Sequence, residues 1–231
     1  MNQTPKKNFT LLLCAKWSSM YVILQVRILP LFKPCLDQLK QPSHLRLVSA
    51  RLWMPDLMKE YTNLQAELLA INSLFKALFP DLPFCAFTMN MGPHTVCIGH
   101  RDLWNVVYGT CPIGALGPFN HRTGGHIILH EPKVIIEFRR GDVIFIPSAA
   151  VTHENAPILD GEARYSFTMY SAGGLFCYAW CGMRTLKEVR EADKALYEKY
   201  IAEGTRRWEE GWKKYSTIDD LISRTKCSSK E

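Results

Sequence analysis

The segment that decides the fold class is Gly125-His-Ile-Ile-Leu-His-Glu-Pro-Lys-Val-Ile-Ile-Glu-Phe-Arg-Arg-Gly-Asp-Val-Ile-Phe-Ile146. It contains three short runs rich in β-branched residues, at 125–129, 134–138 and 143–146. Gly and Pro residues and the turn dipeptide Gly141-Asp142 separate these runs, as is typical of strands joined by tight turns. Many short strands at close spacing predict a sandwich or a barrel.

More strand-like runs lie on both sides of this segment. One covers Thr95–Ile98, and another covers Arg164–Tyr170 after a second turn dipeptide, Asp160-Gly161. Residues 85–180 are therefore expected to form a single β-rich core.

Helical patterns flank this core. Between residues 56 and 79 apolar side chains recur at intervals of three and four, and Pro80 ends the pattern. A helical pattern returns after Gly182 and continues to about Trp212. A chain of 231 residues favours one domain with elaborations. We therefore expect an α+β fold, with one domain over residues 51–182 and a helical extension over 183–231.

Residues 1–50 are expected to be basic and irregular, because prolines at 30, 34 and 42 break any long element. Eight Lys or Arg residues precede residue 53, against the single acid Asp37. Such a basic segment suits a polyanion such as nucleic acid, or it is a solvated terminus. Its apolar runs are too short to cross a bilayer, and the run Phe9–Ala15 is short even for a signal peptide, so we expect no membrane segment.

The eight cysteines form no Cys-x-x-Cys pair, which argues against a zinc module. Several lie in apolar runs, where cysteine behaves as a small hydrophobic residue. This usage favours a reduced, intracellular protein, and a nuclear location would follow only from a nucleic-acid substrate.

The residues that best fit metal chemistry are His100, Asp102 and His153. His100 and Asp102 follow a strand-like run in Cys97-Ile-Gly-His-Arg-Asp102, and residues i and i+2 of an extended segment face the same way. His153 comes several strands later and supplies a second imidazole. Two imidazoles and one carboxylate on one face of Fe(II) leave room for an oxoacid cosubstrate and O2.

Arg164 and Ser166 are placed to bind the cosubstrate. A planar guanidinium grips a carboxylate with two hydrogen bonds, and a hydroxyl two residues later lies on the same face of the strand. The alternative is that Arg164 only pairs with Glu154 or Glu162.

Together these motifs resemble the TET and J-binding-protein family of dioxygenases, most closely the homologues in mushroom-forming fungi. The resemblance rests on His100-Arg-Asp-Leu-Trp-Asn105, His153-Glu-Asn155 and Arg164-Tyr-Ser166. It extends over about residues 85–180 through Asn90–Thr95, Ala115–Gly117, Gly124-Gly125, Ile146–Ser148 and Tyr170–Leu175. It implies a double-stranded β-helix core of the jelly-roll, cupin-like type, and oxidation of a pyrimidine methyl group in nucleic acid with Fe(II), 2-oxoglutarate and O2.

Residue by residue, the resemblance makes His100, Asp102 and His153 the iron ligands and assigns Arg164 and Ser166 to 2-oxoglutarate. Asn105 matches an asparagine that binds the flipped base, and Tyr170 matches an aromatic residue that stacks on it. One departure stands out. Ala172 replaces the base-contacting histidine of the animal enzymes, whose cysteine-rich zinc module is also absent.

Each assignment has a structural alternative. The two histidines can be core residues, Asn105 can bond its own backbone in a turn, and Tyr170 can be a packed aromatic residue. His94, His121, His126 and His130 are interpreted as structural or surface residues, and Gly124-Gly125 as relief at a bend of the barrel. Trp208, Trp212, Lys213 and Lys214 are interpreted as a surface face, with nucleic-acid contact as the alternative.

Three hypotheses follow. The leading one is a dioxygenase that hydroxylates the methyl group of 5-methylcytosine or thymine in nucleic acid. The second keeps the cofactors but acts on a protein or small-molecule substrate, as Ala172 suggests. The third, suggested by the basic N-terminal segment, is a non-catalytic, transposon-derived protein that binds nucleic acid.

Overall fold

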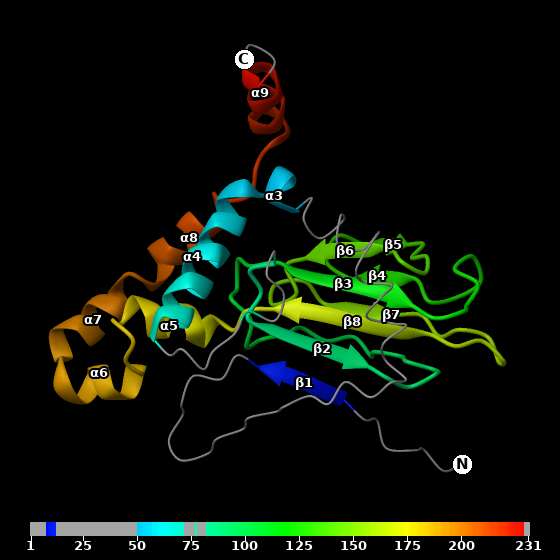
Figure 1. Ribbon diagram of the computed structural model, residues 1–231, viewed down its shortest axis with the longest axis horizontal. Helices are drawn as coiled ribbons and strands as arrows, with labels where there is room; N and C mark the ends of the chain where they lie inside the picture. The colour runs from blue at the N-terminus through cyan, green and yellow to red at the C-terminus, as the bar shows by residue number, and fades with distance from the viewer. Residues whose placement is uncertain (1–7, 13–49, 72–76, 78–81, 229–231) are drawn as a thin grey trace.

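The computed structural model describes residues 8–12, 50–71, 77 and 82–228. Its strands form two antiparallel sheets (Figure 1). The larger sheet has the order β1 (Asn8–Leu12), β2 (Ala86–Asn90), β8 (Tyr165–Tyr170), β3 (Cys111–Leu116) and β6 (Val143–Ile146). The smaller sheet has the order β5 (Val134–Ile136), β4 (Ile127–Leu129) and β7 (His153–Asn155). The mixed α and β composition with antiparallel sheets confirms the coarse prediction.

The two faces of the larger sheet carry different cores. Phe87 of β2 and Phe167 of β8 pack against Leu57 and Tyr61 of the helix α4 (Pro55–Ile71). On the opposite face, β3 and β6 pack against the smaller sheet through a second apolar cluster around Ala115, Ile127 and Phe138. Because side chains alternate along a strand, the residues of β8 that turn away from α4 face the smaller sheet.

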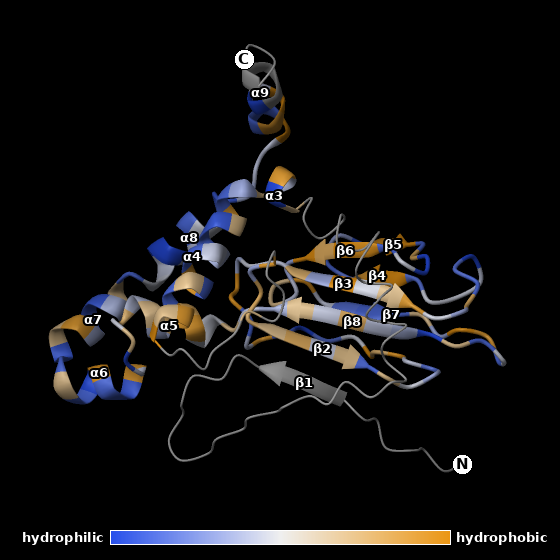
Figure 2. Cartoon of the chain, in the orientation of Figure 1, coloured by the Kyte–Doolittle hydropathy of each residue, from blue (hydrophilic) through white to orange (hydrophobic). Residues whose placement is uncertain are grey.

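The helices are α3 (Ala50–Trp53), α4, α5 (Gly173–Trp180), α6 (Leu186–Ala192), α7 (Lys194–Ala202), α8 (Gly204–Trp212) and α9 (Ile218–Ser228). Helices α4 to α8 lie together beside one end of the sheets, and α9 projects away from them (Figure 1). Thr185 and Glu188 form a capping box that starts α6, and the Asp193 side chain caps α7. Figure 2 shows α5 as largely hydrophobic and α8 as mostly hydrophilic, in keeping with the packing of α5 against α4. Among the described residues, no helix is both long and apolar enough to span a membrane.

The structure departs from the sequence predictions at three elements. The helix expected over 56–79 is present as α4 up to Ile71; residues 72–76, 78 and 79 lie outside the described residues, and Ala77 is not helical. Residues 8–12, expected to be irregular, pair as β1 with the open edge of β2. The segment Thr95–Ile98, expected to be a strand, is not one. Its backbone bonds to the side chain of Asn155 instead of pairing with a neighbouring strand.

Candidate metal centre and cosubstrate pocket

Backbone pairing fixes His100 and His153 opposite each other. The N–H of His100 donates to the His153 carbonyl at 3.2 Å, and the N–H of His153 donates to the His100 carbonyl at 3.0 Å. This antiparallel bridge joins the loop before β3 to the first residue of β7. The two imidazole rings are consequently close, with centroids 4.4 Å apart.

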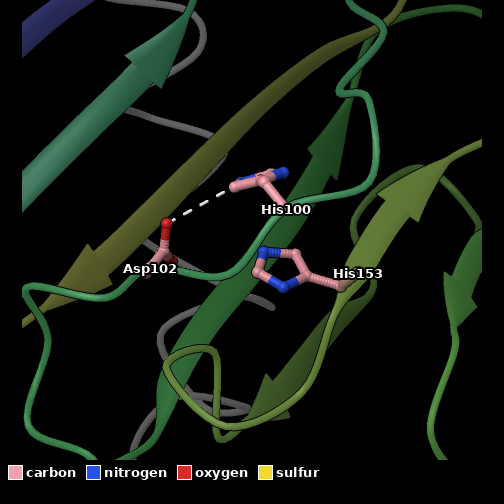
Figure 3. Close-up of side chains that lie close together, drawn as sticks. All are labelled: His100, Asp102 and His153. Carbon is pink, nitrogen blue, oxygen red and sulfur yellow. Dashed lines mark ion pairs between the residues drawn. The ribbon is translucent and has the colours of Figure 1, made fainter.

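Asp102 completes a three-residue cluster (Figure 3). One potential ligand atom from each of His100, Asp102 and His153 lies within 4.8 Å of the other two. The His100 Nε2 to Asp102 Oδ1 distance is 3.7 Å, and the backbone N–H of Asp102 is anchored to the Ser148 carbonyl at 2.9 Å. The predicted proximity of these three side chains is confirmed.

The hydrogen bonds of the two imidazoles suit metal binding. His100 Nδ1 lies 2.7 Å from the Ile98 carbonyl, and His153 Nδ1 lies 3.0 Å from the Val151 carbonyl. A carbonyl only accepts, so each Nδ1 is the donor, and in the neutral ring this tautomer leaves the lone pair of Nε2 available for a metal. Burial, and to a lesser degree the neighbouring His100, lower the pKa of His153, which favours its neutral, ligating form. The donor set of two nitrogens and one carboxylate fits Fe(II).

Arg164 is a buried cation that forms no ion pair within the described part of the chain. Its side chain is 1% exposed, and among the described residues no acidic group forms an ion pair with it. Nη1 makes one long hydrogen bond to the Thr95 carbonyl at 3.5 Å, and Nε has no partner. Burial lowers the pKa of Arg164. A buried unpaired charge costs on the order of several kcal/mol, so the surroundings of Arg164 are suited to an anionic ligand.

The alternative pairing of Arg164 with Glu154 or Glu162 is not found. Glu154 instead pairs with His130 at 3.2 Å and accepts the N–H of Gly99. Glu162 accepts the backbone N–H groups of Asn120 and Leu159. Both carboxylates are therefore used elsewhere on the surface.

Ser166 lies two residues after Arg164 and is 4% exposed. Its Oγ accepts a hydrogen bond from Asn90 Nδ2 at 3.0 Å, which leaves the hydroxyl proton free to donate to a ligand. Tyr170, the last residue of β8, is half-buried and on the same face of the strand as Arg164 and Ser166.

Asn105 lies beside the cluster of His100, Asp102 and His153. Its Nδ2 donates to Ser148 Oγ at 3.0 Å and is 3.4 Å from Asp102 Oδ2. Its side chain therefore bonds other side chains rather than its own backbone, unlike a simple turn former. Its backbone forms an isolated β-bridge with Ala172. The alanine that differs from the motif of the animal enzymes is therefore next to Asn105.

Sequence reasoning missed the role of Asn155. This 5% exposed residue accepts the N–H of Cys97 at 2.8 Å through Oδ1 and donates to the Thr95 carbonyl at 3.1 Å through Nδ2. It therefore ties the segment that leads to His100 to the strand that carries His153. The available signal was its position two residues after His153, on the same face of β7.

The remaining predicted glycines and histidines have structural settings. A Cβ on Gly124 would lie 2.4 Å from the Pro157 carbonyl oxygen, and Gly125 has a φ of +72°, so the interpretation of this pair as backbone relief is confirmed. His121 pairs with Glu137 at 2.9 Å, and His130 with Glu154.

Comparison with known proteins gives distant structural likenesses only. No family model matches the chain, and no curated protein matches it. Among solved structures, NgTET1 in complex with 5mC DNA is 16% identical, with a TM-score of 0.40, over 50% of this chain and 41% of that one.

Two further solved structures are similar over shorter spans. An oxidoreductase of the 2OG-Fe(II) oxygenase family from Burkholderia pseudomallei is 23% identical, with a TM-score of 0.31, over 38% of this chain and 42% of that one. The viral collagen prolyl hydroxylase of Paramecium Bursaria Chlorella virus-1, in its 2OG complex, is 16% identical, with a TM-score of 0.28, over 36% and 55%. Each of these three likenesses spans less than two thirds of the other chain and has a TM-score below 0.5, so function must be judged from the residues of this chain.

Proposed function

We propose that this chain is an Fe(II)- and 2-oxoglutarate-dependent dioxygenase. The observation that carries the proposal is that two features occur together. One is the cluster of three potential metal ligands, and the other is the buried Arg164, which forms no ion pair with a described carboxylate. A three-ligand cluster alone would suit several metals, and a buried arginine alone would suit many anions. Together they supply the two needs of this chemistry, a metal with open positions and a cation for the far carboxylate of the oxoacid.

The topology supports a double-stranded β-helix of the jelly-roll type. Along the chain, successive segments alternate between the two sheets: β2 in the larger, residue 100 bridged to the smaller, β3 in the larger, β4 and β5 in the smaller. The alternation continues with β6, β7 and β8. Two facing antiparallel sheets wound in this way are what a jelly roll requires.

The residues of the chain would divide the work as follows. His100, Asp102 and His153 would hold Fe(II) through Nε2 and carboxylate oxygens, and Arg164 with Ser166 would orient 2-oxoglutarate. Bound iron supplies the oxidation itself, in which O2 and 2-oxoglutarate convert a substrate methyl group to hydroxymethyl with release of succinate and CO2. Asn105 would orient the Asp102 carboxylate through its amide, and the protein needs no acid or base of its own.

For the substrate, we propose the methyl group of a pyrimidine, 5-methylcytosine or thymine, in nucleic acid. The sequence motif His100-Arg-Asp-Leu-Trp-Asn105 supports this choice, and so does the position of Asn105 beside the cluster. A second candidate is a protein or small-molecule substrate with the same cofactors. Ala172 favours it, because its backbone is bridged to that of Asn105 while its methyl side chain offers no hydrogen bond to a base.

Incubation of the iron-loaded chain with 2-oxoglutarate and methylated or unmethylated oligonucleotides tests the proposal. We expect hydroxymethylated nucleoside by mass spectrometry and succinate in equal amount, both reduced at least about tenfold in Asn105→Ala, as for loss of a substrate hydrogen bond in the active site. Succinate formation that no oligonucleotide stimulates would remove nucleic acid as the substrate and favour the second candidate.

A further inference from the structure

Three exposed apolar side chains lie close to His100 and Asp102 along the chain. The exposed fractions are 79% for Ile98, 70% for Leu103 and 90% for Trp104. These three residues, named here the apolar rim, lie within the seven residues that also contain His100 and Asp102. Trp104 is the most exposed large apolar side chain among the described residues.

The exposure of the rim does not come from a loosely held loop. The Trp104 carbonyl accepts the N–H of Gly173 at 2.9 Å, and the N–H of Asn105 donates to the Asp102 carbonyl at 2.9 Å. The backbone is thus held on both sides of the indole while the indole itself faces water. Exposed apolar groups that are held in place mark binding surfaces, because leaving them in water gives no stability.

A cavity of about 640 Å³ adjoins the rim. Its lining includes Leu103, Trp104 and Asn105, together with Trp180, Arg207 and Trp208 of the C-terminal helices. The Arg207 guanidinium lies 3.8 Å from the centroid of the Tyr200 ring and 5.4 Å from that of Trp180. The walls are therefore rich in flat surfaces, and the volume is in the range of small-ligand sites.

All three Lys or Arg side chains that line the cavity, Arg206, Arg207 and Lys214, already have an acidic partner. Arg206 lies 3.2 Å from Glu203, and Lys214 lies 3.2 Å from Glu60. The cavity is accordingly suited to stacking more than to neutralising many phosphates. Arg101 lies outside this lining, three residues before Trp104 in the chain. It is exposed and forms no ion pair with a described residue, although Glu131 is an electrostatic neighbour.

The exposed indole of Trp104 and the exposed guanidinium of Arg101, three residues apart in the chain, match the two parts of a nucleotide, a base and a phosphate. We propose that the apolar rim and the adjoining cavity bind a single-stranded segment of nucleic acid. Trp104 stacks on the base next to the one that is oxidised, and Arg101 contacts a phosphate. This inference rests on the proposed function and names the surface that would recognise its substrate.

Binding of a short fluorescein-labelled single-stranded DNA that carries 5-methylcytosine tests this surface, with the full-length, metal-free chain and fluorescence anisotropy. Trp104→Ala is expected to raise the Kd about 5- to 100-fold, as for the loss of one base–aromatic stack. Trp104→Phe should keep most of the affinity, because it keeps a ring. The matched control is Trp53→Ala in α3, a tryptophan that is 59% exposed and does not line the cavity; it should leave the Kd unchanged.

The inference would be overturned if the wild type did not bind the oligonucleotide, or if Trp53→Ala lost as much affinity as Trp104→Ala. A Kd for Trp104→Ala within about twofold of the wild-type Kd would also overturn it, because the loss of a base–aromatic stack should cost more. Tighter binding of an aromatic peptide than of the oligonucleotide would also overturn it. The visible band of the Fe(II) and 2-oxoglutarate complex, measured on the same variants, separates the two proposals. A band that is present in the wild type and in Trp104→Ala, with unchanged DNA binding in the variant, would contradict the rim assignment alone.

Discussion

His100 and His153 form a hydrogen-bonded antiparallel pair, so that each histidine fixes the backbone of the other at 3.2 and 3.0 Å. Because their Nδ1 atoms also bond to carbonyls two residues earlier, at Ile98 and Val151, both rings are held before any metal binds. A site built in this way is preorganised, and its neighbours should affect metal binding through geometry.

The buried guanidinium of Arg164 gives a prediction in two parts. Arg164→Met should weaken 2-oxoglutarate binding at least about 30-fold, as expected when one partner of a buried charge pair is removed. The same change should leave the free energy of unfolding of the ligand-free protein unchanged or raised, because it removes an unpaired buried charge. Calorimetric titration and denaturant unfolding measure the two effects. A loss of more than about 2 kcal/mol in stability with intact 2-oxoglutarate binding would make Arg164 a packing residue.

Asn155 should act on the metal site through the backbone it holds. Asn155→Ala removes the hydrogen bonds that its amide makes with the N–H of Cys97 and the carbonyl of Thr95, which should lower stability by about 2–4 kcal/mol. Iron affinity should fall about 10- to 100-fold, as for other residues that orient ligands. Asn63→Ala, at an exposed position of α4, is the control for both measurements. Unchanged iron affinity in Asn155→Ala would show that the hydrogen bonds of Asn155 do not position His100.

Gly114 tests the packing of β3 against β8. A Cβ built there would lie 2.0 Å from Cε1 of Phe167, so Gly114→Ala must displace a buried ring and should cost about 1–3 kcal/mol. Gly174 has open space around it, and Gly174→Ala in α5 should be neutral or slightly stabilising. Thermal unfolding of the two variants compares them directly. Equal Tm values would argue against this packing.

Local patterns predicted much of the fold and the closeness of the metal cluster. In the runs that form β4, β5, β6 and β8, apolar and polar side chains alternate, or a short apolar stretch lies between two turns. Each of these patterns can be recognised within a few residues. β3 was missed because Pro112 and Gly114 argue against a strand. In the structure, Gly114 is what allows the close approach of Phe167, and Pro112 precedes the residues of β3 that pair with β8.

The parts that the sequence did not predict depend on contacts between distant residues. The sequence around Asn155 does not reveal that its amide bonds to the backbone of residues 95–98 in place of strand pairing, because these partners are some 60 positions away in the chain. In the same way, the lack of a carboxylate beside Arg164 follows from the partners that Glu154 and Glu162 find elsewhere. Spacing along the chain identified the residues but not this network.

The most direct test of the central claim is anaerobic reconstitution of the chain with Fe(II), followed by titration with 2-oxoglutarate while the weak visible metal-to-ligand charge-transfer band is recorded. We predict a saturable band in the wild type that is lost in His153→Ala, with His121→Ala, a surface histidine paired with Glu137, as the control that keeps it. A well-folded wild type that shows no band, or a band that persists in His153→Ala, would contradict the assignment of this cluster as an iron and 2-oxoglutarate site.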